Sequence, residues 1–313
     1  MTLRARYPAV LGACLLAAHA ACAAAPKSSS DQQFGVIGHS FSNRGGERQL
    51  EKSLAKTRDA GLAFVVATGI KSLAEPCSDE LYERRRNMFD GGRTPVVVVP
   101  AASDWAECKN AAGRLVNIER LNRLRELLYA EPGAPSDNAL ALARQSANAK
   151  FRSYAENAYW SAGNVLYATV NLPSNNNHYR PEAGRNSEFE DRAVANRFWI
   201  SRLFALAKRK KLAALVLFSE GDARVLSGEP GLLARLGRNS STQDGFALPR
   251  RQIVALAAQF PGKVLLIDTA PVANGSEPVI AWRDNLGHVS IGARAVHVHV
   301  TPKAETLFRI EQP

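Results

Sequence analysis

Polar residues with catalytic or ligand-binding chemistry follow the apolar, strand-like runs of this sequence. Histidine and serine can act as a general base and a nucleophile, and carboxylates and imidazoles can bind cations. Because functional residues of α/β proteins gather in loops beyond the carboxyl ends of the strands, we expect these side chains to meet in one cleft. The residues expected to line this cleft are His39, Ser40, Ser103, Asp104, Asn175, Asn176, Asp222 and Asp268.

The sequence lacks the short motifs that mark a metal site or an activated serine. No HExxH, CxxC or GxSxG occurs, and Ser40 is only a chain neighbour of His39. The weak candidates for a metal ligand are His39, His178, Asp104, Asp222, Asp268, His297 and His299. His297 and His299 share one face of a strand because they lie two residues apart. We expect no cofactor and no bound metal, and retain only His39 and Asp268 as weak metal candidates.

Strand-like and helix-like segments alternate through most of the chain, which predicts one α/β domain over residues 34–310. The uniformly apolar run 95–100 is typical of a central strand that is covered on both faces. Strict alternation over 294–301 predicts a half-exposed strand. The expected strands are 34–38, 62–69, 95–100, 164–172, 213–218, 264–267 and 294–301, and the expected helices are 46–60, 80–89, 118–129, 189–210 and 250–259.

The N-terminal segment predicts export. Arg4 and Arg6 precede an apolar run over 9–25, and Ala21-Cys22-Ala23 fits the small-residue cleavage pattern of a secretory signal peptide. We therefore expect a signal peptide over 1–23 and a polar linker over 24–33. A lipoprotein signal is the alternative, because residues 11–14 (LGAC) resemble a lipobox.

Charge and cysteine content narrow the possible environments and partners. Cleavage would leave 38 basic and 29 acidic residues, a net charge of +9, and two cysteines, Cys77 and Cys108. Two cysteines in an exported protein most simply form one disulfide, and we expect the mature chain to be periplasmic or extracellular without a transmembrane segment. The basic runs 84–86 and 208–211 are not interleaved with aromatic residues, which argues against a specific nucleic-acid partner.

A series of motifs is similar to an exported bacterial branch of the calcineurin-like metallophosphoesterases. The motifs occur in one order from about residue 34 to 310, and they are GIKS at 69–72, CSDELYERRR at 77–86, VPAASDWAEC at 99–108, ERLNRLREL at 119–127, SNNN at 174–177 and VHVTP at 298–302. The resemblance implies a calcineurin-type fold, with two packed mixed β-sheets flanked by helices in a four-layer αββα arrangement. It also places Cys77 and Cys108 at matching positions.

The resemblance fails at the positions where it would place metal ligands. Gly69 runs directly into Ile70, so the aspartate that would bridge two metals is absent, and Ser103 stands where an asparagine ligand is expected. His39 and Phe41 occupy the ligand positions of the first motif, and the last histidine motif is reduced to residues 267–270 (IDTA). A two-metal hydrolase needs ligands that hold its cations about 3.5–4 Å apart.

Two functions follow from this pattern of matches and losses. The first is a catalytically degenerate phosphoesterase-like protein, a pseudoenzyme that binds an anionic ligand or a protein partner in the remaining cleft. The alternative is an active phosphoric ester hydrolase with a rebuilt or single-metal site, which would need a divalent metal.

Overall fold

The computed structural model describes residues 31–42, 46–59, 61–129, 140–181, 184, 186–227, 243–273, 275–302 and 306–313. The expected signal peptide over 1–23 and most of the expected linker over 24–33 lie outside these residues. Strand β1 (Gln32–Ile37) begins within the last part of the expected linker, so the folded domain starts slightly before residue 34.

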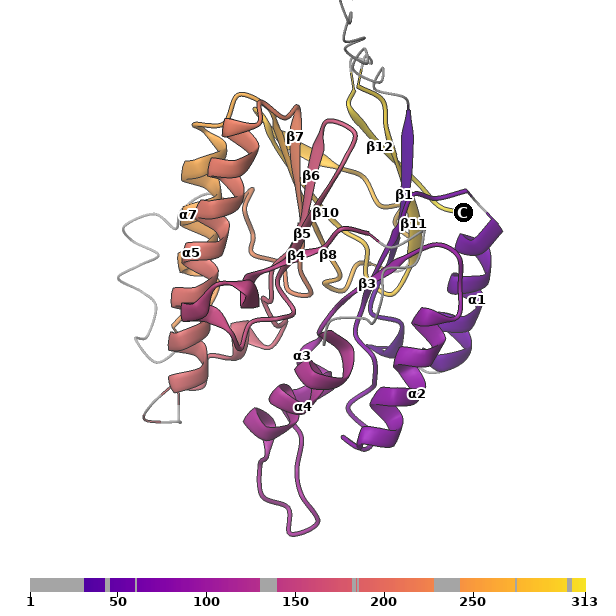
Figure 1. The fold of residues 1–313 in the computed structure, drawn as a ribbon, viewed down its shortest axis with the longest axis vertical. Helices are drawn as coiled ribbons and strands as arrows, with labels where there is room; N and C mark the ends of the chain where they lie inside the picture. The colour runs from indigo at the N-terminus through magenta and orange to yellow at the C-terminus, as the bar shows by residue number, and fades with distance from the viewer. Residues whose placement is uncertain are drawn as a thin grey trace, which may run out of the picture.

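Two mixed β-sheets pack face to face (Figure 1). In the five-stranded sheet, ordered β12-β11-β1-β2-β3, the strands β1, β2 and β3 are parallel and β11 is antiparallel to both of its neighbours. Its other strands are β2 (Val65–Thr68), β3 (Val96–Val99), β11 (Ala295–Val300) and β12 (Phe308–Glu311).

The seven-stranded sheet has the order β4-β5-β6-β7-β8-β10-β9, with a parallel centre from β6 to β10 and antiparallel strands at both edges. Its strands are β4 (Ala143–Arg144), β5 (Ala158–Ala162), β6 (Val165–Thr169), β7 (Ala214–Phe218), β8 (Lys263–Asp268), β9 (Ala281–Arg283) and β10 (Leu286–Ser290).

Helices cover the outer face of each sheet. One apolar cluster joins α1, α2 and α4 to the five-stranded sheet, and a second joins α5 and α7 to the seven-stranded sheet. The helices are α1 (Gly46–Asp59), α2 (Asp79–Asp90), α3 (Ala102–Trp105), α4 (Asn117–Tyr129), α5 (Ser187–Arg209) and α7 (Ala247–Ala257), and the 3-10 turns are η1 (Ser40–Ser42), η2 (Gln145–Ala147), η3 (Ala149–Phe151) and η4 (Asn176–His178).

Aromatic rings fill the space between the two sheets. Phe34 of β1 and Phe64, which directly precedes β2, are stacked with ring centroids 5.0 Å apart, and the Phe64 ring lies edge to face with Tyr167 of the other sheet at 4.8 Å. These side chains are fully buried, so their removal from water is a major favourable contribution to folding. The α/β class and the flanked pair of mixed sheets are confirmed.

Several strand expectations need correction. The strands β4, β5, β9, β10 and β12 were not expected, and all five lie at or next to a sheet edge, where the apolar pattern is weak. Strand β3, expected as a central strand, lies at the edge of the five-stranded sheet. Strand β11 shows part of the expected exposure, because Ala295 and His299 on its second face are partly exposed. His297 on that face is only 7% exposed. Among the described residues, no helix is both long enough and apolar enough to span a bilayer.

Candidate functional site

A cleft of about 1020 Å³ opens beyond the carboxyl ends of the parallel strands of both sheets. Parallel strands bring their carboxyl ends to one edge, where α3 and α4 lie in Figure 1. The cleft is lined by His39, Phe41, Gly46, Glu47, Ser72, Leu73, Ala74, Glu75, Ala102, Ser103, Glu107, Ser174, Asn175 and Glu220. Of the expected cleft residues, only His39, Ser103 and Asn175 line it.

His39 lies between the two sheets and is almost completely buried, at 8% exposure. Its Nε2 lies 3.1 Å from Ser103 Oγ and 3.4 Å from the carbonyl oxygen of Lys71. Gly69 has a positive φ, and a side chain on it would place a Cβ 2.2 Å from the His39 ring. The glycine therefore leaves the space that the imidazole occupies.

Glu220, which follows β7, is the acidic partner of His39 in the cleft wall. Its Oε1 lies 3.9 Å from His39 Nδ1 and accepts a hydrogen bond from Ser174 Oγ at 2.9 Å. Its Oε2 accepts from the N–H groups of Ala102 at 2.6 Å and of Ser174 at 2.8 Å. Burial raises the pKa of Glu220, while the charge of His39 and the two N–H donors act in the opposite direction.

The raised pKa of Glu220 predicts a pH dependence that Glu220→Gln removes. Between the ordinary carboxyl pKa of 4.5 and the higher folded-state value, the folded protein holds a proton that the unfolded chain has lost. The contribution of Glu220 to the unfolding free energy therefore falls as pH rises through this window. We expect Glu220→Gln to become steadily more stable relative to the wild type over that interval, as measured by urea unfolding at several pH values.

Glutamine can keep the hydrogen bonds of Glu220, which makes this variant a fair test. Its amide oxygen can accept from Ala102 and Ser174 N–H, and its NH₂ group can donate to Ser174 Oγ. A stability difference that stays constant with pH would contradict the prediction.

Asp104 lies beneath the cleft and organises its floor. The side chain is fully buried; its Oδ1 accepts from the N–H groups of Ile70 at 2.9 Å and Lys71 at 3.1 Å, and its Oδ2 accepts from Ala101 N–H at 2.7 Å. Burial raises the pKa of Asp104, opposed by His39 and by these donors. Asp104 thus joins the loops after β2 and β3 and does not face the cleft.

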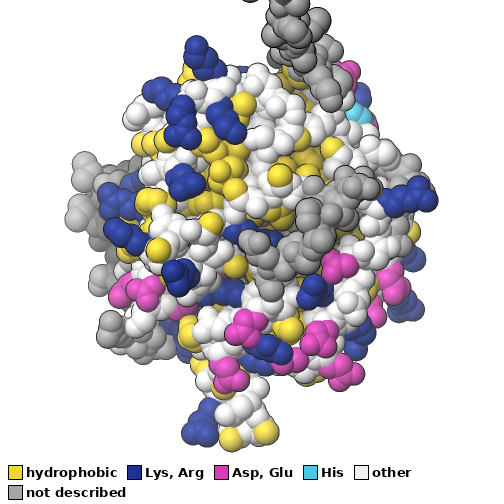
Figure 2. All heavy atoms as spheres, in the orientation of Figure 1, with side chains coloured by type: hydrophobic (Ala, Val, Ile, Leu, Met, Phe, Trp, Pro, Cys, Tyr) yellow, Lys and Arg dark blue, Asp and Glu magenta, His cyan; other side chains and the backbone are white. Residues whose placement is uncertain are grey.

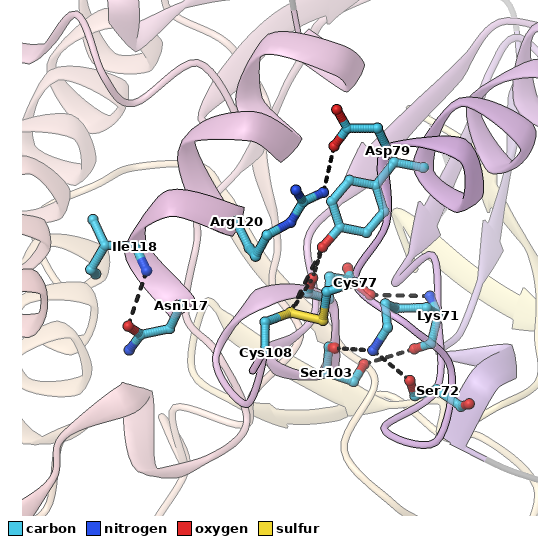
Figure 3. Close-up of a disulfide and its surroundings, with 11 residues drawn as sticks. Lys71, Ser72, Cys77, Asp79, Ser103, Cys108, Asn117, Ile118 and Arg120 are labelled. Atoms are coloured by element: carbon cyan, nitrogen blue, oxygen red, sulfur yellow. Dashed lines mark hydrogen bonds and ion pairs between the residues drawn. A yellow bond between two sulfur atoms is a disulfide. The ribbon is translucent and has the colours of Figure 1, made fainter. Parts of the chain in front are cut away.

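Lys71 is a second buried charge in the same floor. Its ammonium donates to the carbonyl oxygens of Ser72 at 2.6 Å and Ser103 at 2.8 Å, as Figure 3 shows. Burial lowers the pKa of Lys71, while the charges of Asp104 and Glu75 raise it. The Lys71 ammonium therefore links the loop after β2 to the loop after β3 through these hydrogen bonds.

Arg85 is a buried cation that pairs with two glutamates of the cleft wall, Glu47 and Glu75. It is fully buried, stacks over the Phe41 ring at 4.6 Å, and donates to Ile70 O at 2.9 Å. Its guanidinium also pairs with Glu75 Oε1 at 2.6 Å and with Glu47. Two of the lining glutamates therefore share one arginine.

The expected disulfide joins Cys77, before α2, to Cys108, after α3. Figure 3 shows it next to Lys71 and Ser103, with the Arg120–Asp79 ion pair on its other side. It connects the segment that follows β2 with the segment that follows β3, so it closes the cleft floor covalently.

The loop after β6 borders the cleft with three consecutive left-handed residues, Asn176, Asn177 and His178. Arg192 and the backbone of Gly245 hold the Asn177 side chain, and Asn176 bonds to Gln243 and Gly245. Asn176 therefore supports the loop. Backbone in this region costs about 1–3 kcal/mol per residue and persists only where surrounding contacts fix it.

The other expected site residues lie away from the cleft. Ser40 is buried and donates to Gly38 O at 3.3 Å, and His178 packs against the Trp105 ring at 4.6 Å. His299 pairs with Glu311 at the opposite end of the molecule from the strand carboxyl ends. Asp222 and Asp268 meet at a second position on the edge of the seven-stranded sheet, together with His288.

Sequence reasoning missed several residues of the cleft and its floor. Glu220 lies two residues after an expected strand, so the rule that pointed to Asp222 could also have selected it. His288 had no such signal, because it lies within the unexpected strand β10. The cleft glutamates 47, 75 and 107 lie on or near helices, and only the tertiary structure brings them to the cleft.

The cleft does not fit a pair of catalytic metal ions. It offers one imidazole, of His39, and one buried carboxylate, of Glu220, and both are held by neighbours. Among the described residues, the group able to place three His, Cys, Asp or Glu ligand atoms together is Asp222, Asp268 and His288, none of which lines the cleft.

The Ser103–His39–Glu220 series does not form a hydrolytic triad either. Ser103 Oγ donates to the carbonyl oxygen of Lys71 at 2.8 Å, which is shorter than its distance to His39. The separation of 3.9 Å between His39 Nδ1 and Glu220 exceeds a hydrogen bond. The groups form a polar wall in which the Ser103 hydroxyl donates to a backbone carbonyl oxygen and the carboxylate does not hydrogen-bond the imidazole.

Comparison with known proteins identifies no family for this chain. Neither a scan against models of protein families nor a search of curated protein sequences finds a match.

Proposed function

We propose that the protein is an exported binding protein on a calcineurin-type phosphoesterase scaffold that has lost two-metal catalysis. The ordered motifs and the arrangement of two mixed sheets with outer helices support the scaffold. The disulfide is compatible with export. The loss of catalysis rests on the metal-ligand positions, which hold residues engaged in the cleft wall.

The lining of the cleft indicates the charge of the ligand. It includes four glutamates and, among the described residues, no lysine or arginine. Asn175 Oδ1 is also buried there without a hydrogen-bond donor in the described part of the chain. The net charge of the chain favours an anionic ligand, but this lining of acceptors favours a cationic one, so we propose that the cleft holds an amine or guanidinium group.

The distribution of charge on the surface agrees with an acidic cleft on a basic protein. In Figure 2, acidic side chains gather toward the lower end, near α2 and α4, whereas basic side chains cover the upper ends of α5 and α7. On this face, the basic side chains at the upper ends of α5 and α7 lie away from the lower end, where basic side chains also stand among the acidic ones.

Spermidine is a suitable cationic probe for calorimetric titration at low ionic strength. We expect the wild type to bind spermidine and not inorganic phosphate, with weaker binding as salt screens the carboxylates. Glu107→Gln, which removes an exposed lining charge, should weaken binding about twofold to fivefold. Glu126→Gln, on the exposed face of α4, is the matched control and should leave binding unchanged.

Two outcomes would contradict the proposal. Binding of phosphate in preference to spermidine would support the sequence-based hypothesis that the cleft binds an anionic ligand. Hydrolysis of p-nitrophenyl phosphate in the presence of Mn²⁺ or Zn²⁺, lost in His39→Ala, would restore the alternative of an active phosphoesterase.

A further inference from the structure

Three side chains converge at the carboxyl edge of the seven-stranded sheet, away from the cleft. Asp268 ends β8, Asp222 lies in the loop after β7, and His288 lies on β10, the neighbour of β8. His288 Nε2 lies 2.6 Å from Asp268 Oδ2 and 3.3 Å from Asp222 Oδ1. One ligand atom from each residue lies within 4.8 Å of the other two.

His288 is the shared basic partner of the two carboxylates. In a chain with net charge +11, neither Asp222 nor Asp268 forms an ion pair with lysine or arginine among the described residues. Asp222 also accepts a hydrogen bond from the backbone N–H of Arg224 at 2.5 Å. Asp268 accepts from the backbone N–H of Ala270 at 3.0 Å and from the Ser290 side chain. Asp268 is fully buried, and a buried carboxylate is costly without a compensating positive charge; among the described residues, His288 is the basic side chain that pairs with it.

We infer that Asp222, Asp268 and His288 form a binding site for a single divalent cation of the Mn²⁺-to-Zn²⁺ series. Imidazole and carboxylate are the ligands that these cations accept, at about 2.0–2.2 Å for zinc. The cation would replace the proton on His288 Nε2, and the 2.6 Å contact with Asp268 would open by less than about 1 Å.

The proposed cation site would keep a coordination position open to solvent or to another ligand. Three protein ligands leave at least one coordination position, and the Asp222 and His288 side chains are 30% and 16% exposed, so solvent or a donor group can reach it. It does not rest on the proposed function, because none of the three residues lines the cleft.

Calorimetric titration of the purified, tag-free protein with ZnCl₂ and MnCl₂ tests this inference. We expect one cation per chain and a rise in the thermal unfolding temperature with cation concentration. Asp222→Asn, which alters the most exposed ligand, and His288→Gln should each weaken affinity about 100-fold or more. Visible absorption of the Co²⁺-loaded protein, lost in both variants, reports coordination independently of heat.

His299→Gln is the control, because His299 pairs with one carboxylate, Glu311, far from the three ligands. It should leave the affinity unchanged. Absence of binding up to about 1 mM cation overturns the inference. So does binding whose affinity is the same in folded Asp222→Asn and His288→Gln as in the wild type, with circular dichroism melts reporting the fold.

Discussion

Asp104→Ala should destabilise the protein by about 4–5 kcal/mol, a large share of the stability of an ordinary domain. The substitution leaves three buried N–H groups, those of Ile70, Lys71 and Ala101, without an acceptor. Each unsatisfied group costs about 1–3 kcal/mol. It also removes the carboxylate that faces the buried Lys71 ammonium. The measurement is the free energy of unfolding in urea.

A matched aspartate shows whether the effect is specific. Asp90→Ala removes an exposed carboxylate that pairs with Arg86 across one helical turn, and it should change stability by less than about 0.5 kcal/mol. Asp104→Asn keeps one acceptor oxygen and should recover only part of the loss, because its NH₂ group faces a backbone donor. A loss below about 1 kcal/mol in Asp104→Ala would contradict the role assigned to this carboxylate.

Removing the disulfide in a Cys77→Ala, Cys108→Ala double variant should cost about 3–4 kcal/mol of unfolding free energy. The bond closes a loop with a sequence separation of 31 residues, and its loss restores conformational entropy to the unfolded chain. Alanine is preferred to serine because Cys108 is buried, at 1% exposure. Urea unfolding of both proteins, with and without reductant, measures the difference.

The reduced wild type serves as the internal control for the disulfide. Its stability should fall to that of the double variant, while reductant should leave the variant unchanged. Equal stability of the oxidised wild type and the variant would mean that packing around Tyr82 and the Asp79–Arg120 pair already holds these segments together.

The sequence by itself predicted the α/β class, most of the strands that are covered on both faces, and the cysteine pair. The run 96–99 forms strand β3 and is apolar because both of its faces are covered, but its composition did not reveal that β3 lies at the edge of the five-stranded sheet. Strands at or near the edges of the two sheets were harder to predict. Strand β10 contains Gly287 and His288, and its position next to β8 depends on pairing that no local pattern encodes.

The sequence also placed polar residues at the correct edge of the sheets, but only the tertiary structure decided their roles. Asp104 and Ser103 are adjacent in the chain, yet one binds backbone beneath the floor and the other lines the cleft. Glu75 reaches the cleft from a loop, and His288 reaches Asp268 from another strand. These contacts depend on the direction in which each side chain points from elements that are far apart in sequence. Chain order and residue type do not determine those directions.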